Sequence, residues 1–422
     1  MKKIDRILSL IAIAVILFTA ATGCAPKRAN IIEKVRTAII EQWKLPFDSL
    51  YLQKNKLPDA VVYLPAPPDT TSEIFKEDYN RWLWGKTVRP TPRGKQASIE
   101  SLYGIVRMCT IYSEVLGLKI DSQKTPAIYR FMLYVGETAH QSTAHAKETY
   151  MRVRPFARAG EKVWGEFDYD ELRNNGSYPS GHTALGWATA LALVEVAPKL
   201  QDTILRRGYQ YGESRVIVGA HWQSDVYAGY NVASAAVAAM HNSPRFIAHL
   251  EAAQEEYNRL TTNQNSPTTT RHKKAKSNAF SLPHDGKILD TLLIKRDGDI
   301  NRYPSLGRKN KTVEEKLFSM VSEELQRSNY TFIQPDINWA FALIGAEIEP
   351  RNQDNILQRG FDYGNYLGNK SKDPTDLIQA RRILASAVVA SLHTNPKFMA
   401  MLAKVKAIHQ STHSYSPYSL YF

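Results

Sequence analysis

The stretch Pro179–Val196, with the sequence PSGHTALGWATALALVEV, decides the fold. From Ala184 onward it is almost entirely apolar and contains no proline, and the run is long enough for a buried helix of about three turns. Ser180 is of the residue type that caps a helix N-terminus, and Gly181 lets a ligand approach the backbone closely. Unpaired amides and the helix dipole at such an N-terminus favour an anion. The stretch therefore predicts a core helix that begins at an anion-binding turn.

The same helical pattern continues on both sides of this stretch. From about residue 97 to residue 248, apolar residues recur every three or four positions, with breaks at Gly117, Pro126, Gly176–Pro179 and Pro198. The sequence has no β-branched alternation bounded by hairpin turns. It therefore predicts an all-α fold, a helical bundle, preceded by a proline-rich passage at residues 63–68 that cannot be regular helix.

Two basic residues upstream form a first chemical cluster, Lys147-x6-Arg154-Pro155. Seven positions make nearly two helical turns, so we expect Lys147 and Arg154 to project from one face and hold the same phosphate. Pro155 is expected to end that helix at or near Arg154. A basic pair at this spacing is also common on a solvated helix face, so this cluster alone does not indicate a phosphate site.

Two further clusters carry histidines. His182 follows the turn Pro179–Gly181, where it would overhang a bound anion and protonate a leaving group. In Ser214-Arg215-x5-His221-x3-Asp225, a helix would let Asp225 accept a hydrogen bond from one nitrogen of His221 and leave the other nitrogen free to attack. Gly219 predicts a helix break that turns Arg215 toward the same pocket. Each pattern by itself also occurs in structural turns and on helix surfaces.

Taken together and in this order, the clusters resemble the signature K-x6-RP, PSGH and SR-x5-H-x3-D. It is shared by type 2 phosphatidic acid phosphatases, bacterial class A nonspecific acid phosphatases and vanadium haloperoxidases. The resemblance is closer to the class A acid phosphatases than to the other two groups. The stretches that look like this family are Tyr63–Pro68, Lys147–Phe156, Tyr178–Thr183, Gly186–Ala190 and His221–Asp225. The resemblance covers roughly residues 60 to 255.

The resemblance implies a helical bundle with the site at its core and with no metal or other cofactor. It implies that phosphate is held by Lys147, Arg154, Ser180, Gly181 and Arg215. It also implies that His221 is the nucleophile that forms a phosphohistidine, that Asp225 orients it and that His182 is the general acid and later the base. The expected activity is acid phosphatase action on small phosphate monoesters.

Two alternatives remain open at this stage, and a third is disfavoured. A vanadate-dependent haloperoxidase would use the same pocket, with His221 as a ligand. A lipid phosphate phosphatase acting at the membrane surface would be favoured by a membrane tether, although no apolar run after Cys24 reaches the roughly 20 residues of a membrane span. A non-catalytic binding protein would lack signature residues, and none is missing.

The N-terminus predicts export. MKKIDRILSLIAIAVILFTAATGC combines a basic start with an apolar run from Ile7 to about Ala21, which is short for a span but suits a secretory signal. The small residues before Cys24 resemble a bacterial lipobox, although Ala21 stands where leucine is usual. We expect a periplasmic protein or an envelope lipoprotein, attached through Cys24 most readily to the outer membrane. An ordinary cleaved signal or an uncleaved anchor is the alternative.

The net charge and the cysteine content limit the binding partners and disulfides that we expect. The net charge is +13, and removal of residues 1–23 takes away three positive charges and one negative charge, which leaves +11. A basic surface suits anionic substrates or lipid headgroups. We expect no nucleic-acid partner, because the dense basic run Arg271–Lys276 lies in a predicted linker and no groove-reading motif is present. Cys109 is the only other cysteine and is expected in the core, without a disulfide.

The chain also contains a partial internal repeat. Trp187–Leu250 aligns with Trp339–Leu402 without a gap, and roughly 25 pairs are identical where about four are expected by chance. The same shift puts Gln334 opposite His182, Leu367 opposite Arg215, Asp373 opposite His221 and Leu377 opposite Asp225. The second copy therefore lacks the chemical residues, and we expect it to serve packing, dimerisation or partner binding.

These features predict the domain organisation. The expected parts are a signal peptide (1–23), a tether with a helix near residues 31–43 (24–60), the catalytic domain (61–258), a linker (259–312), the degenerate helical repeat (313–410) and a tail (411–422).

Overall fold

The computed structural model describes residues 50–102, 104–165, 170–264, 312–328, 332, 334–361 and 375–412. The first part of the chain has the helices α3 (Ala60–Tyr63), α4 (Glu73–Val88), α5 (Pro92–Ile99), α6 (Ile105–Leu116), α7 (Pro126–Gln141), α8 (Ala144–Tyr150), α9 (Pro155–Arg158), α10 (Gly181–Val196), α11 (Gln201–Ile217), α12 (Gln223–Met240) and α13 (Pro244–Gln264). Short 3₁₀ helices lie at Lys54–Lys56, Asp170–Asn174 and Pro198–Leu200. The second part has α15 (Val313–Arg327), α16 (Gln334–Ile348), α18 (Thr375–Leu392) and α19 (Pro396–Thr412). The described residues form no strand, which confirms the all-α prediction.

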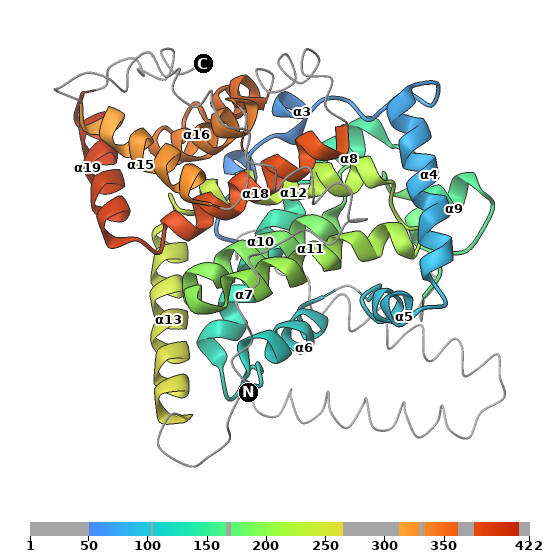
Figure 1. Ribbon diagram of the computed structural model, residues 1–422, viewed down its shortest axis with the longest axis horizontal. Helices are drawn as coiled ribbons and strands as arrows, with labels where there is room; N and C mark the ends of the chain where they lie inside the picture. The colour runs from blue at the N-terminus through green and yellow to red at the C-terminus, as the bar shows by residue number, and fades with distance from the viewer. Residues whose placement is uncertain are drawn as a thin grey trace, which may run out of the picture. The chain divides into compact units, whose positions relative to one another are not determined.

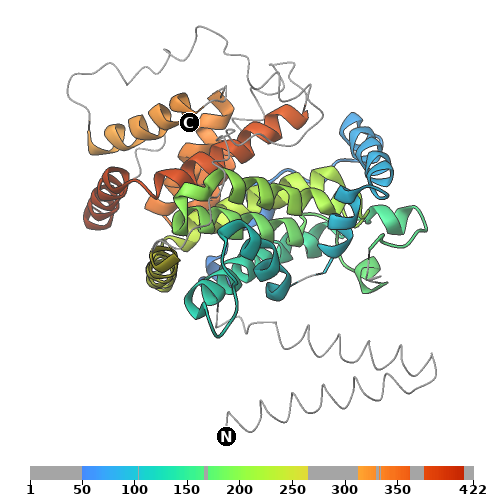
Figure 2. The ribbon, with the colours of Figure 1, turned by 60° about the horizontal axis from the view of Figure 1, so that its bottom comes forward.

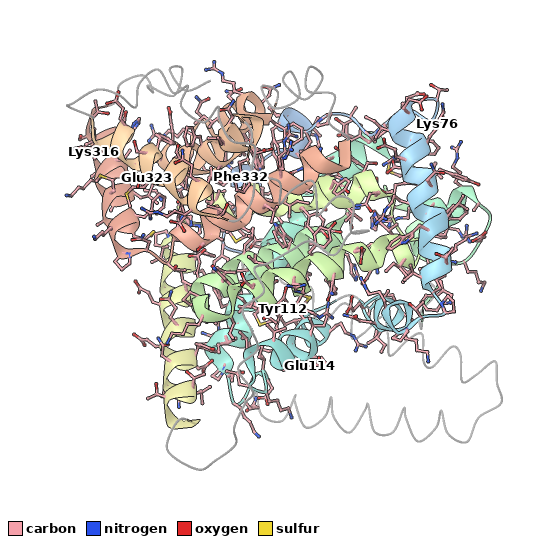
Figure 3. The ribbon with its side chains drawn as sticks, in the orientation of Figure 1. Lys76, Tyr112, Glu114, Lys316, Glu323 and Phe332 are labelled. Carbon is pink, nitrogen blue, oxygen red and sulfur yellow. The ribbon has the colours of Figure 1, made fainter. Side chains whose placement is uncertain are left out.

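Helix α10 is the centre of the first group of helices. Every one of its residues is buried, and it packs chiefly against α11, α12 and α7 (Figure 1). Tyr112 reaches in from α6, and its hydroxyl donates a hydrogen bond to the carbonyl oxygen of Gly186 at 3.2 Å (Figure 3). Gly186 and Gly208 are needed here, because an added Cβ would lie 2.2 Å from the Tyr211 ring or 2.5 Å from Ala190. The apolar run therefore forms the buried helix that the sequence predicts.

The predicted breaks coincide with helix ends. Helix α6 ends before Gly117, which adopts a left-handed conformation with φ of 66°. Helix α7 begins at Pro126, and the Ser180 side chain caps α10 by accepting a hydrogen bond from the Thr183 amide at 3.3 Å. Tyr63 ends α3, and the proline-rich residues that follow are not helical, as expected.

The predicted helix from Lys147 to Arg154 is wrong. Helix α8 ends at Tyr150, and Met151 has a left-handed conformation with φ of 41° that turns the chain out of the helix. Arg154 is extended, and Pro155 starts α9 rather than ending a helix. Proline fits this first helical position because its missing amide would have no helical partner there.

The second group of helices follows the shift found in the sequence. The shift that aligns Trp187 with Trp339 also carries α12 onto α18, and it carries the start of α13 at Pro244 onto the start of α19 at Pro396. In Figure 2, α18 (red) lies against α16 (orange), and the contacts between the groups are reciprocal: α10 packs against α18, and α12 packs against α16. The duplication itself remains a prediction from the sequence.

Several sequence predictions concern segment boundaries. Helix α13 runs through Gln264, past the predicted domain end at residue 258, and α19 runs to Thr412. Cys109 is buried and free, as expected. The predicted signal peptide, Cys24, the helix near residues 31–43 and most of the linker lie outside the described residues. None of the described helices is long and apolar enough to cross a membrane.

Candidate active site

A tight turn between α11 and α12 positions His221. Gly219 has φ of 78°, which is unfavourable for residues with a Cβ, and the amides of Ala220 and His221 both donate to the carbonyl oxygen of Arg215. The neighbouring Trp222 is buried against Phe75 and Trp82, and its indole donates to the Val153 carbonyl at 2.8 Å. Arg215, in the last turn of α11, and His221 are thereby held close together, as the predicted break at Gly219 requires.

Hydrogen bonds define which nitrogen of His221 carries the proton. Arg154 Nη1 lies 2.9 Å from His221 Nε2, and because a guanidinium only donates, Nε2 is the acceptor. Nδ1 therefore carries the proton, and it faces Ser177 Oγ at 3.3 Å and Asp225 Oδ2 at 3.5 Å. Burial and then Arg154 hold the pKa of His221 well below its usual value, so the imidazole is neutral. Its unprotonated nitrogen points toward the basic cluster.

Asp225 is held by a dense set of donors, but it does not share a helix with His221 as predicted. His221 precedes α12, whereas Asp225 is in its first turn, where its Oδ2 accepts from the Trp222 amide at 2.8 Å and from Ser177 Oγ at 2.5 Å. Arg152 pairs with Oδ1 at 2.5 Å. Although burial raises the pKa of Asp225, Arg152 and His221 lower it below the usual range, so the group is a carboxylate.

Three cations gather at His221: Arg154 and Arg215 are buried, and Lys147 is half-buried. Lys147 Nζ donates to the carbonyl oxygen of Gly176 at 2.8 Å, and Arg154 donates to the carbonyls of Asn175 and Ala220 at 3.0 Å each. Burial, then Arg154 and Arg215, lower the pKa of Lys147 well below its ordinary value. Burial also lowers the pKa of Arg154, to about 9. The carbonyl partners of Lys147 and Arg154 carry no net charge, so the positive charge of the cluster favours an anion.

The start of α10 completes the cluster. Ser180 Oγ accepts from the Thr183 amide and from Thr183 Oγ1 at 2.9 Å, which leaves its own proton for a further acceptor. Gly181 has no room for a side chain, because a Cβ would lie 2.4 Å from the His140 ring. His182 stacks on Tyr211 with ring centroids 5.5 Å apart. Its pKa is lowered by burial first and then by Arg215 and His221, which places His182 beside them.

The structure brings all the predicted site residues within the described part of the chain into one region. These are His221, His182, Asp225, Lys147, Arg154, Ser180, Gly181 and Arg215; Cys24 lies outside it. Sequence reasoning missed Ser177, which links His221 and Asp225, and the buried pair Arg152–Asp78 behind Asp225. Arg152 lies inside the Lys147–Phe156 stretch and Ser177 directly precedes the Tyr178–Thr183 stretch, which is a weak signal. Asp78 lies in α4, and nothing in the sequence relates it to the site.

Comparison with known proteins identifies the family. Residues 127–247 match the model of the PAP2 superfamily. A non-specific acid phosphatase of Providencia stuartii is 43% identical over 214 residues, which cover 50% of this chain and 86% of that protein. The chain belongs to the PAP2 superfamily. Within it, the chain is an acid phosphatase of the class A type, as the sequence resemblance implied.

Two more relatives agree with this assignment. A non-specific acid phosphatase of Salmonella typhimurium is 39% identical over 199 residues, which cover 46% of this chain and 79% of that protein. An acid phosphatase of Zymomonas mobilis is 32% identical over 209 residues, which cover 50% of this chain and 79% of that protein. Each match covers about half of the chain.

Ser177 provides a first test of the site. Ser177→Ala removes a hydrogen bond to the buried Asp225 carboxylate and an acceptor for His221 Nδ1–H. Hydrogen bonds to charged groups contribute about 1.5–3 kcal/mol, so we expect kcat for p-nitrophenyl phosphate to fall about 10- to 100-fold. Ser234→Ala is the matched control, because Ser234 is equally buried on α12 but bonds only the Tyr230 carbonyl. Equal kcat in both variants would contradict a role for Ser177 in orienting His221.

Proposed function

We propose that this acid phosphatase hydrolyses phosphate monoesters through a phosphohistidine on His221, without a metal ion at the reacting phosphate. The observation that carries the proposal is the neutral His221 imidazole, whose Nε2 lone pair faces Arg154 while Nδ1–H faces Ser177 and Asp225. A nucleophile needs such an unprotonated nitrogen, and a fixed partner on the other nitrogen selects it.

In the first step, the hydrogen bond from Arg154 passes from His221 Nε2 to a phosphoryl oxygen. Nε2 then attacks phosphorus, and the bond from phosphorus to the ester oxygen breaks. Lys147, Arg154 and Arg215 neutralise the charge on the phosphoryl oxygens, and Ser180 and the Gly181 amide donate hydrogen bonds to them. His182 protonates the leaving alkoxide. The free-enzyme pKa of His182 is depressed by burial and Arg215, and a bound phosphate dianion would offset the charge of Arg215 and favour the protonated form.

In the second step, water replaces the leaving group. His182, now neutral, takes a proton from water as the water oxygen attacks phosphorus and the P–N bond to His221 breaks. Inorganic phosphate leaves, and both histidines return to their starting states. Asp225 stays ionised throughout, since its carboxylate accepts from three donors and its pKa lies below the usual range.

The phosphohistidine can be trapped directly. Phosphoramidates of histidine survive alkali but not acid, so mixing with ³²P-labelled substrate followed by an alkaline quench should leave label on the peptide that contains His221. Mild acid should release it as inorganic phosphate. Label on another residue, or none while p-nitrophenol is produced in a burst, would exclude this intermediate. Treatment with EDTA should leave kcat unchanged, and vanadate should inhibit.

Export and lipidation at Cys24 are part of the proposal. They rest on the signal-like N-terminus and place the enzyme in the periplasm, or in the cell envelope as a lipoprotein. Cys24→Ser should move the activity from the membrane fraction to the soluble fraction; equal membrane retention of both proteins would exclude lipid anchoring through Cys24. The vanadium haloperoxidase alternative predicts peroxide-dependent bromide oxidation without phosphate release.

A further inference from the structure

Four titratable side chains meet away from the active site, where the two groups of helices pack together. Glu195 is in α10 and Glu347 in α16, and His241 and His393 directly follow the ends of α12 and α18. His241 Nε2 lies 3.1 Å from Glu195 Oε2, and His393 Nε2 lies 2.9 Å from Glu347 Oε1. The two imidazole rings stack with centroids 4.1 Å apart. We call these four residues the His–Glu quartet.

The quartet has a two-fold arrangement. The shift that aligns Trp187 with Trp339 carries Glu195 onto Glu347 and His241 onto His393. Each carboxylate therefore faces the histidine of its own copy, and the two histidines stack on each other across the contact between the copies. The two pairs thus lie side by side, with the ligand atoms of Glu195, His241 and His393 close enough to share one ion.

Both histidines have the tautomer that metal ligands use. His241 Nδ1 lies 2.9 Å from the Val237 carbonyl, and His393 Nδ1 lies 2.9 Å from the Val389 carbonyl. A carbonyl only accepts, so each Nδ1 carries a proton and each Nε2 faces the carboxylates. Metal-bound histidines almost always donate their second ring N–H in this way, which orients the ring.

The quartet also holds buried polar atoms that lack hydrogen-bond partners in the described structure. They are Glu195 Oε1, Glu347 Oε1 and His393 Nε2. Glu347 Oε1 and His393 Nε2 are only 2.9 Å apart, but their orientation does not make a hydrogen bond. The Glu195 and Glu347 side chains are 2% and 0% exposed, so bulk water does not reach these atoms to form hydrogen bonds with them. An unmet buried acceptor is costly and calls for a ligand.

The charges around the quartet favour a cation. Lys406, from α19, approaches the other carboxylate oxygen, Glu347 Oε2, at 3.4 Å and leaves Oε1 toward the histidines. Two carboxylates in this setting attract positive charge, which protons or a metal ion can supply.

We propose that the His–Glu quartet binds one divalent transition-metal ion of the zinc type. Ligand atoms of Glu195, His241 and His393 lie within 4.8 Å of one another. Glu347 Oε1, 2.9 Å from His393 Nε2, would supply the fourth donor. Two imidazole nitrogens with carboxylate oxygens form a set that suits zinc, at about 2.0–2.2 Å per bond, so the side chains draw inward on binding. Magnesium and calcium prefer oxygen ligands and fit less well. Any proton on Nε2 of either histidine is released to solvent when the nitrogen binds the ion.

The ion would act as a structural link between the two groups of helices. It takes ligands from α10 and the end of α12 on one side, and from α16 and the end of α18 on the other. It touches none of the residues assigned to phosphate chemistry. The inference therefore does not depend on the phosphohistidine mechanism, and removal of the ion should lower thermal stability without lowering kcat at 25 °C.

The experiment uses the full-length protein. After EDTA treatment and gel filtration, zinc or cobalt(II) is added, and bound metal is measured by plasma mass spectrometry alongside Tm. We expect one equivalent of zinc, a higher Tm, and visible cobalt(II) bands typical of tetrahedral N/O ligands. Glu195→Gln keeps the size of the side chain and should weaken zinc binding more than about 100-fold. His409→Gln is the matched control, since His409 pairs with Glu314 outside the quartet and should bind zinc normally.

The pH dependence separates a metal site from a simple ion-pair cluster. Zinc competes with protons for Nε2 of His241 and His393, so the increase in Tm caused by zinc should grow between pH 6 and pH 8. Less than stoichiometric zinc on the wild type, or equal zinc binding by Glu195→Gln and wild type, would overturn the proposal and leave the quartet as an ion-pair cluster only.

Discussion

Replacing His221 with alanine is expected to lower kcat by about 10⁶-fold, the loss seen when a covalent nucleophile is removed from a comparable hydrolytic site. The substitution removes the only group that we propose to attack phosphorus, whereas Lys147, Arg154 and Arg215 keep their positions for binding phosphate. Affinity for phosphate should therefore change much less than kcat. Turnover of a panel of phosphomonoesters, and phosphate binding by calorimetry, measure the two effects separately.

His249→Ala is a suitable control for this prediction. His249 lies in α13, where it contacts Tyr51 and Tyr134 and takes no part in the site. We expect its kcat to stay within about threefold of the wild type, because it lies away from the site. Full turnover by His221→Ala, with a folded structure verified by circular dichroism, would remove His221 from the mechanism.

Much of the fold can be predicted from the sequence because its signals are local. The apolar run after His182 forms the buried helix α10. Glycine or proline lies where helices end or begin, as at Gly117, Pro126 and Gly219. The repeat shift also carries the helix bounds of α12 onto those of α18. The helix signals depend on neighbouring residues and the repeat on an alignment of the chain with itself, so a single sequence contains both.

The parts of the site that could not be predicted depend on contacts between distant segments. The seven-residue spacing of Lys147 and Arg154 matches a helix, but Met151 takes a left-handed conformation that no residue type in this stretch signals. The cations still converge, because carbonyls of the loop before α10 hold both Lys147 and Arg154. Ser177 and Asp225 meet only after folding. The spacing therefore predicted a helix that does not form, although the structure brings the predicted residues into one region.

Arg152 is the clearest example of a site residue whose role depends on contacts between distant segments. Of the substitutions considered, its replacement should have the largest effect on stability. Arg152 lies between two buried carboxylates, 2.8 Å from Asp78 Oδ2 and 2.5 Å from Asp225 Oδ1, and its side chain is only 8% exposed. Arg152→Met keeps the apolar stem but leaves both carboxylates without their cation. Breaking a buried ion pair on one side costs about 3–5 kcal/mol, so we expect the free energy of unfolding to fall by that amount in urea titrations.

The activity of Arg152→Met should fall as well, because the pKa of Asp225 is kept low chiefly by Arg152. As that pKa rises, Asp225 takes up a proton at acid pH and stops accepting from Nδ1 of His221, so the acid limb of the kcat profile should move to higher pH. Arg158→Met is the matched control, because Arg158 is exposed over the Phe75 ring. This substitution should lower the free energy of unfolding by less than about 1 kcal/mol. Adding Asp78→Asn to Arg152→Met removes one of the two stranded charges and should restore part of the stability. The prediction would be wrong if Arg152→Met were as stable as Arg158→Met and kept the wild-type pH profile. Ser177 and the Trp222 amide would then be enough to hold the Asp225 carboxylate without Arg152.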